Sequence, residues 1–149
     1  MDGEDILIKL NTIIALIISI LFGVFNFNQW FLGYYPNEYQ ARASIIFTIL
    51  CFVYGFAEGY KNEEVFIKKF SLFCTISSVF LLAGYFLNLL LIALPFAFIF
   101  GSPMHGYMYF LNIPTDMRLS LLCVFIIYGI VLIGFYLGKL FTLSHMRRV

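Results

Sequence analysis

Four long stretches without aspartate, glutamate, lysine or arginine divide this chain of 149 residues, and they cover residues 10–37, 43–57, 70–115 and 119–138. The hydrocarbon core of a bilayer is about 30 Å thick, so a helix crosses it with about 20 apolar residues. Charged residues make up 11% of the chain and the mean hydropathy is +0.96, whereas about 25% of an ordinary soluble domain is charged. The sequence therefore predicts an all-α, polytopic membrane protein.

The positions of lysine and arginine predict how often the chain crosses, because positive charge is retained on the cytoplasmic side. With four crossings and a cytoplasmic N-terminus, only Arg42 and Arg118 are external, and seven basic residues are cytoplasmic: Lys9, Lys61, Lys68, Lys69, Lys139, Arg147 and Arg148. Five crossings give five cytoplasmic and four external basic residues. We therefore predict a four-helix bundle with both termini cytoplasmic, forming one transmembrane domain over residues 1–149 with helices at about 6–27, 41–60, 70–94 and 119–141.

Residues 96–118 follow the third predicted helix and contain Gly101, Pro103, Gly106 and Pro114. Pro95 is expected to end or kink that helix, because proline lacks a backbone donor and disfavours helix in the residue before it. The segment is too broken for a clean span and too apolar for a solvated loop. We expect an outer segment that is interfacial or re-entrant.

Small and polar residues recur every three or four positions along each predicted helix, which is the pattern of helices that pack together in lipid. Helix 41–60 carries Ser44, Thr48, Cys51, Gly55, Glu58 and Gly59 on one such stripe, and helix 6–27 carries Thr12, Ala15, Ser19, Gly23 and Asn26. Two GxxxG motifs, Gly55 with Gly59 and Gly134 with Gly138, predict close helix packing. That packing would lie either within one bundle or between subunits of an oligomer.

Four polar residues are candidates for a role inside the membrane. Glu58 lies within one turn of the cytoplasmic interface, where Lys61 and Lys139 are expected at the same level. We expect a structural ion pair there, with a proton or ion site as the alternative. Asn88, together with Tyr85, is expected to be a deep hydrogen-bonding group on the third helix. Its role would be contact between helices or, alternatively, the lining of an aqueous path.

No catalytic constellation or phosphate-binding loop is found in the sequence, so we expect no enzyme. Cys51, Cys74 and Cys123 fall on three predicted helices at different depths, and His105 and His145 fall on opposite sides. We therefore expect no metal site and no cofactor.

The cytoplasmic turn and the basic tail are the candidate contacts with other molecules. Residues 61–69 and the C-terminus would either meet lipid headgroups or dock a cytosolic partner through Lys61, Phe66, Lys68, Lys69, Arg147 and Arg148. We expect membrane lipids as partners and no direct contact with nucleic acid.

The predicted function is that of a non-enzymatic integral membrane subunit, homo-oligomeric, in the bacterial cytoplasmic (inner) membrane. It would sense membrane state or anchor and regulate a cytosolic protein, for example in a bacterial stress or phage-defence system. The alternatives are a pore-forming or holin-like channel and, third, a small transporter or flippase subunit that uses Glu58 or Asn88.

Overall fold

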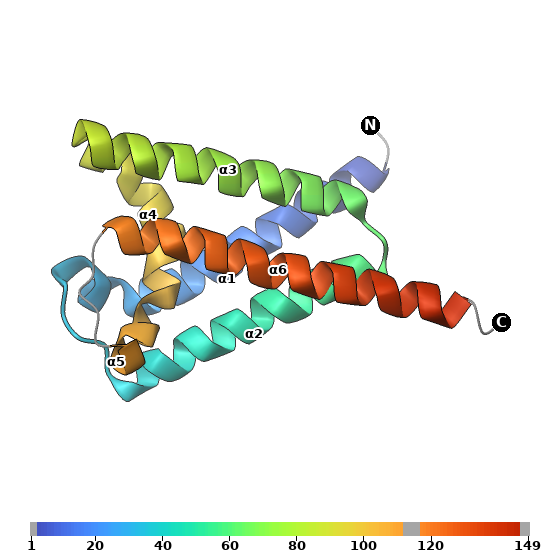
Figure 1. Ribbon diagram of the computed structural model, residues 1–149, viewed down its shortest axis with the longest axis horizontal. Coiled ribbons are helices and arrows are strands. Elements are labelled where there is room, and N and C mark those ends of the chain that lie inside the picture. Colours follow the sequence, from blue (N-terminus) through green and yellow to red (C-terminus); the bar gives the residue numbers. More distant parts are fainter. Residues whose placement is uncertain (1–2, 112–116, 147–149) are drawn as a thin grey trace.

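The computed structural model describes the backbone of residues 3–111 and 117–146, and the side chains of residues 13–111 and 119–144 (Figure 1). The described part is helical and contains no strand, so the predicted all-α class is confirmed. Its elements are α1 (Gly3–Leu32), α2 (Glu38–Tyr60), α3 (Glu64–Leu87), α4 (Leu90–Met104), the 3-10 helix η1 (His105–Tyr107), α5 (Met108–Leu111) and α6 (Met117–Met146).

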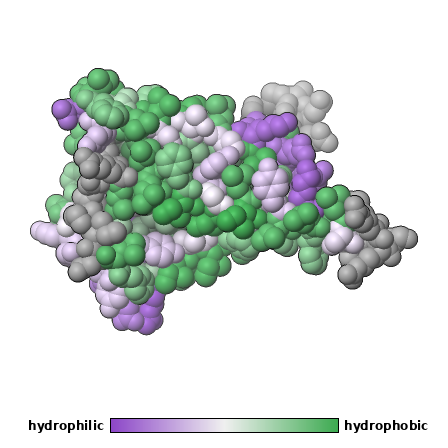
Figure 2. Space-filling view, viewed as in Figure 1, coloured by the Kyte–Doolittle hydropathy of each residue, from purple (hydrophilic) through white to green (hydrophobic). Residues whose placement is uncertain are grey.

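Five helical segments in the described residues are long and apolar enough to cross a membrane: Ile13–Leu32, Glu38–Tyr60, Glu64–Leu87, Leu90–Leu111 and Leu119–Ser144. The predicted count of four is therefore not confirmed by length and composition. Figure 2 shows apolar side chains over the middle of the molecule and hydrophilic ones toward its two ends. This distribution is compatible with an integral membrane protein.

The break after the third helix falls at Asn88 and not at Pro95, so that prediction was wrong. Asn88 adopts the left-handed conformation (φ 53°) and its N–H bonds to the carbonyl of Gly84, which ends α3. Asparagine tolerates this conformation better than most residues. Pro95 and Pro103 both lie inside α4, and the segment predicted to be broken is helical through Leu111.

Helices α1, α2, α3 and α6 run roughly along the long axis of the molecule, whereas α4 runs steeply across that direction at one end of it (Figure 1). Both ends of α4 meet the same end of the bundle. Near its start, Ala93 packs on Gly84 in the last turn of α3, and near its end Gly101 packs beside Trp30 of α1 and Ser120 of α6. Half of the α4 segment is buried, against 17 to 39% of the other four.

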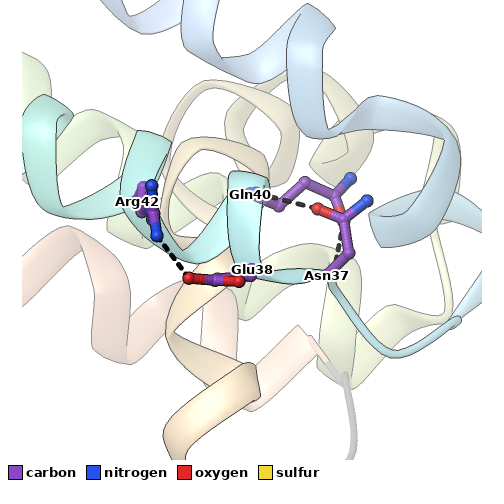
Figure 3. Close-up of polar contacts among 4 residues, drawn as sticks. All are labelled: Asn37, Glu38, Gln40 and Arg42. Atoms are coloured by element: carbon purple, nitrogen blue, oxygen red, sulfur yellow. Dashed lines mark hydrogen bonds and ion pairs between the residues drawn. The ribbon is translucent and has the colours of Figure 1, made fainter.

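A cap fixes the start of α2 at the end of the bundle where α4 lies (Figure 3). The Asn37 side chain accepts a hydrogen bond from the Gln40 N–H, and the Gln40 side chain accepts one from the Asn37 N–H, at 3.0 and 2.9 Å. This reciprocal pair is a capping box, which satisfies N–H groups that the first turn of a helix leaves unpaired. One turn further, Arg42 forms an ion pair with Glu38.

Candidate functional site

The two GxxxG motifs meet each other within one chain. Gly55 and Gly59 of α2 lie against the backbone of Val131 and Phe135 in α6, while Gly134 and Gly138 of α6 lie against Phe52 and Phe56 of α2. At Gly59 an added Cβ would be 2.7 Å from the carbonyl carbon of Phe135 and closer to its oxygen. The absence of side chains at these positions is what lets α2 and α6 approach so closely. Both motifs are thus filled by a contact inside the bundle.

Among the described side chains, Glu58 and Lys61 form an ion pair at the C-terminal end of α2, and Lys139 of α6 forms another with Glu64. Glu58 is 1% exposed, and the ammonium of Lys61 lies 3.2 Å from its carboxylate. Lys139 does not pair with Glu58; its ammonium lies 2.5 Å from a carboxylate oxygen of Glu64, in the first turn of α3. The Lys139–Glu64 pair therefore connects α6 to α3, and Glu58 bonds within its own helix end.

Three predicted site residues lie elsewhere than expected. Phe66 is 1% exposed and packs against Tyr54 and Phe70, so it cannot be a docking residue on the surface. Asn88 is exposed at the end of α3, where it cannot be deep glue between helices, and Tyr85 is partly exposed beside it. Asn88 is exposed because α3 ends at Leu87, seven residues before the predicted helix end at residue 94.

The remaining docking candidates are divided by the structure. Lys61 and Lys68 are exposed and Lys69 is half-buried, at the end of the molecule opposite α4. Arg147 and Arg148 lie outside the described residues.

A buried polar cluster surrounds the end of α4, and the sequence did not predict that its residues meet. The Ser102 hydroxyl donates to the Gly23 carbonyl of α1 at 2.7 Å. The Ser44 hydroxyl of α2 donates to the Pro103 carbonyl at 2.6 Å and accepts from the Gly106 N–H at 3.0 Å. Backbone groups freed where a helix breaks in a membrane need partners inside the protein. The Ser44 hydroxyl is the partner of two such backbone groups at the break between α4 and η1.

Two side chains in the same region carry acceptors that have no hydrogen-bond partner among the described residues, namely Asn26 Oδ1 and His105 Nδ1. Asn26 is fully buried, and its Nδ2 donates to the Pro103 carbonyl at 3.4 Å. The His105 Nε2 lies 3.0 Å from the Tyr34 carbonyl. Because a carbonyl only accepts, Nε2 carries the proton and Nδ1 is a bare acceptor.

Most of the remaining interior is apolar, and the hydroxyls of Ser77 and Ser120 are also buried in it. Its core includes Phe47, Leu81, Phe100, Val124 and Phe135. A cavity of about 30 Å³ lies between α1 and the other helices. Within the described residues no three histidine, cysteine or acidic side chains are placed to hold a metal ion, and the three cysteines are free thiols. The buried polar groups at the end of α4 thus hold this helix through hydrogen bonds to α1 and α2.

A signal for part of the polar cluster was present in the sequence. Gly23, Asn26 and Ser44 fall on the predicted small and polar stripes, but their partners at residues 102–106 lie in the segment expected to be external. Comparison of the chain with protein-family models, with characterised proteins and with solved structures finds no match.

Proposed function

We propose that this chain is a non-enzymatic integral membrane subunit that crosses the bilayer four times and holds a cytosolic partner at the face carrying both termini. Four crossings are supported by the position of α4. Since α4 starts beside Gly84 of α3 and ends beside Ser120 of α6, the chain leaves α3 and enters α6 at the same end of the bundle. The basic residues favour the same topology, because four crossings place seven of nine on one side.

The observation that carries the docking function is the projection of α6 past the bundle (Figure 1). Gly138 packs against Tyr60, and the Thr142 hydroxyl donates to the Tyr60 carbonyl at 2.8 Å. Tyr60 is the last residue of α2, so α6 continues beyond its partner helix from about residue 143.

The last turns of α6, just before and within the projection, present apolar side chains close to the charged level of the bundle, and the Phe141 ring also packs beside Phe56 and Tyr60. Leu140, Phe141 and Leu143 are at least half exposed. They follow Lys139, whose ion pair with Glu64 lies at the level expected for lipid headgroups. Contiguous exposed apolar side chains next to charged ones are typical of a protein-binding surface. A cytosolic protein could therefore cover α6 from Leu140 onward, with Lys61 and Lys68 at the edge of the contact.

Self-association is a further part of the proposal. Both GxxxG motifs are filled within the chain, so a contact between subunits would use another helix face. The pore alternative has less support in the described residues, because the cavity between the helices is small and lined mainly by apolar side chains.

Photo-crosslinking in intact membranes tests the docking function. A photoreactive residue at Leu140 or Leu143 should capture a protein, whereas one at Leu122, which is equally exposed but lies in the apolar belt of α6, should capture only lipid. The captured protein, once purified, should bind the wild-type chain in nanodiscs and lose that binding to the Phe141→Ser, Leu143→Ser variant. Crosslinks to lipid alone at all three positions would rule the docking function out.

A further inference from the structure

A groove between α1 and α2 opens on the outside of the bundle, at the end where α2 begins. Its volume is about 410 Å³. Leu21, Phe22 and Phe25 of α1 line one side, and Ala43 and Ile46 of α2 line the other. Ala43 is buried, and its small side chain leaves the groove open. The groove lies within helical segments that are apolar enough to cross a membrane, so lipid chains are its natural neighbours.

The same groove has a polar mouth. Tyr39 and Arg42 line it at the first turns of α2, and Glu38 lies beside Arg42 (Figure 3). The side chains of Arg42 and Glu38 are 67% and 61% exposed, although they form an ion pair. An exposed pair of this kind contributes little free energy, so either partner can be drawn to another ion at small cost. The hydrophilic surface in Figure 2 at this end of the molecule contrasts with the apolar belt beside it.

The order of these groups is that of a phospholipid. A guanidinium lies above apolar walls, as the phosphate of a phospholipid lies above its acyl chains, and arginine binds phosphate through several N–H donors. The neighbouring Glu38 adds the opposite charge at the same level. A headgroup with a phosphate and a primary ammonium matches both charges, whereas a headgroup with only the negative charge would compete with Glu38 for Arg42 and bring two negative charges together.

We propose that the α1–α2 groove binds one phosphatidylethanolamine-type lipid, with an acyl chain between Phe22 and Ala43, its phosphate on Arg42 and its ammonium on Glu38. The site is independent of the cytosolic partner and needs only that the chain is embedded in a membrane. It lies at the end of the bundle opposite the projecting end of α6 (Figure 1).

Native mass spectrometry of the full chain tests the site. The protein is reconstituted with equal amounts of phosphatidylethanolamine and phosphatidylglycerol of identical acyl chains, and the lipid retained after release from detergent is counted. The wild type should retain one phosphatidylethanolamine per chain in preference to phosphatidylglycerol. Arg42→Gln should lower retention of both lipids about tenfold, as expected for loss of a hydrogen bond to a charged group. Glu38→Gln should abolish the preference for phosphatidylethanolamine over phosphatidylglycerol, while the amount of lipid retained per chain stays the same.

Two further variants separate the groove from its mouth. Ala43→Phe fills the groove and should abolish retention; if that variant does not fold, Ile46→Trp narrows the groove from an exposed position and should lower retention. Glu63→Gln, at the opposite end of the molecule, is the control for the loss of a charge and should behave as the wild type.

Three results would overturn the proposal. One is equal retention by the wild type and Arg42→Gln, and another is a wild-type preference for phosphatidylglycerol. The third is crosslinking between two copies of the chain through a photoreactive residue at Leu21, which would identify the groove as an interface between copies.

Discussion

Replacing Gly59 with alanine should separate α2 from α6. An alanine Cβ at this position would lie 2.7 Å from the carbonyl carbon of Phe135, where 3.4 Å is the lower limit of ordinary contact. The atom it meets is backbone, so the two helices must move apart by at least several tenths of an ångström. Overpacking of this kind costs about 1–3 kcal/mol of stability. It also disturbs the neighbouring contacts of Gly55, Gly134 and Gly138.

Gly129 provides the matched control on α6. An added Cβ there meets no atom of the other described elements within 4 Å. Replacing glycine by alanine inside a helix stabilises it by about 0.5–1 kcal/mol. The free energy of unfolding, measured by titrating micelles with sodium dodecyl sulfate and following helicity by circular dichroism, should fall for Gly59→Ala and be equal or higher for Gly129→Ala. Equal stability of the two variants would refute the close α2–α6 packing.

Three other substitutions, the first with a control, test a buried hydrogen bond, a core side chain and a helix cap by the same unfolding titration. Ser44→Ala removes the hydroxyl that bonds to the Pro103 carbonyl and the Gly106 N–H, and it should lower the free energy of unfolding by about 1–3 kcal/mol. Thr75→Ala is the control, because it removes an exposed hydroxyl bonded within its own helix, and it should cost less than about 0.5 kcal/mol. Phe66→Ala should lower the free energy of unfolding by about 3–5 kcal/mol because the ring is buried. A loss below about 1 kcal/mol would show that the Phe66 ring is exposed. Asn37→Ala removes one half of the capping box and should cost about 1 kcal/mol, and no measurable loss would contradict the cap.

Composition and periodicity predicted the helices and their packing stripes because these depend on local chemistry. Stretches without charge are long enough to be helices in lipid, and Gly55 and Gly59 share a face simply because they are four residues apart. Which helix would fill that face is not a local property. The GxxxG motifs alone fit a contact within the bundle and a contact between subunits equally well, and only the structure shows that Gly55 and Gly59 pair with the face of Gly134 and Gly138.

The end of α3 and the path of α4 could not be predicted from propensity. Proline was expected to mark the break, but Pro95 and Pro103 lie within a helix whose carbonyls find partners in the surrounding protein, as Pro103 does with Ser44. The break falls at Asn88, where the signal is a tolerance of left-handed backbone that asparagine also has at many other positions. Likewise, Lys139 pairs with Glu64 and not with Glu58 because of the way α6 packs against α3, which the sequence does not reveal.

The central claim is that α4 does not add a crossing, so that the turn between α2 and α3 and the end of α6 lie on the same side of the membrane. Single cysteines at Glu63 and Ser144, in a background without the native cysteines, can be labelled with a membrane-impermeant maleimide in vesicles of known orientation. Tyr35, in the turn between α1 and α2, is the control for the other side. We expect positions 63 and 144 to be labelled from one side and position 35 from the other. Labelling of positions 63 and 144 from opposite sides would contradict it.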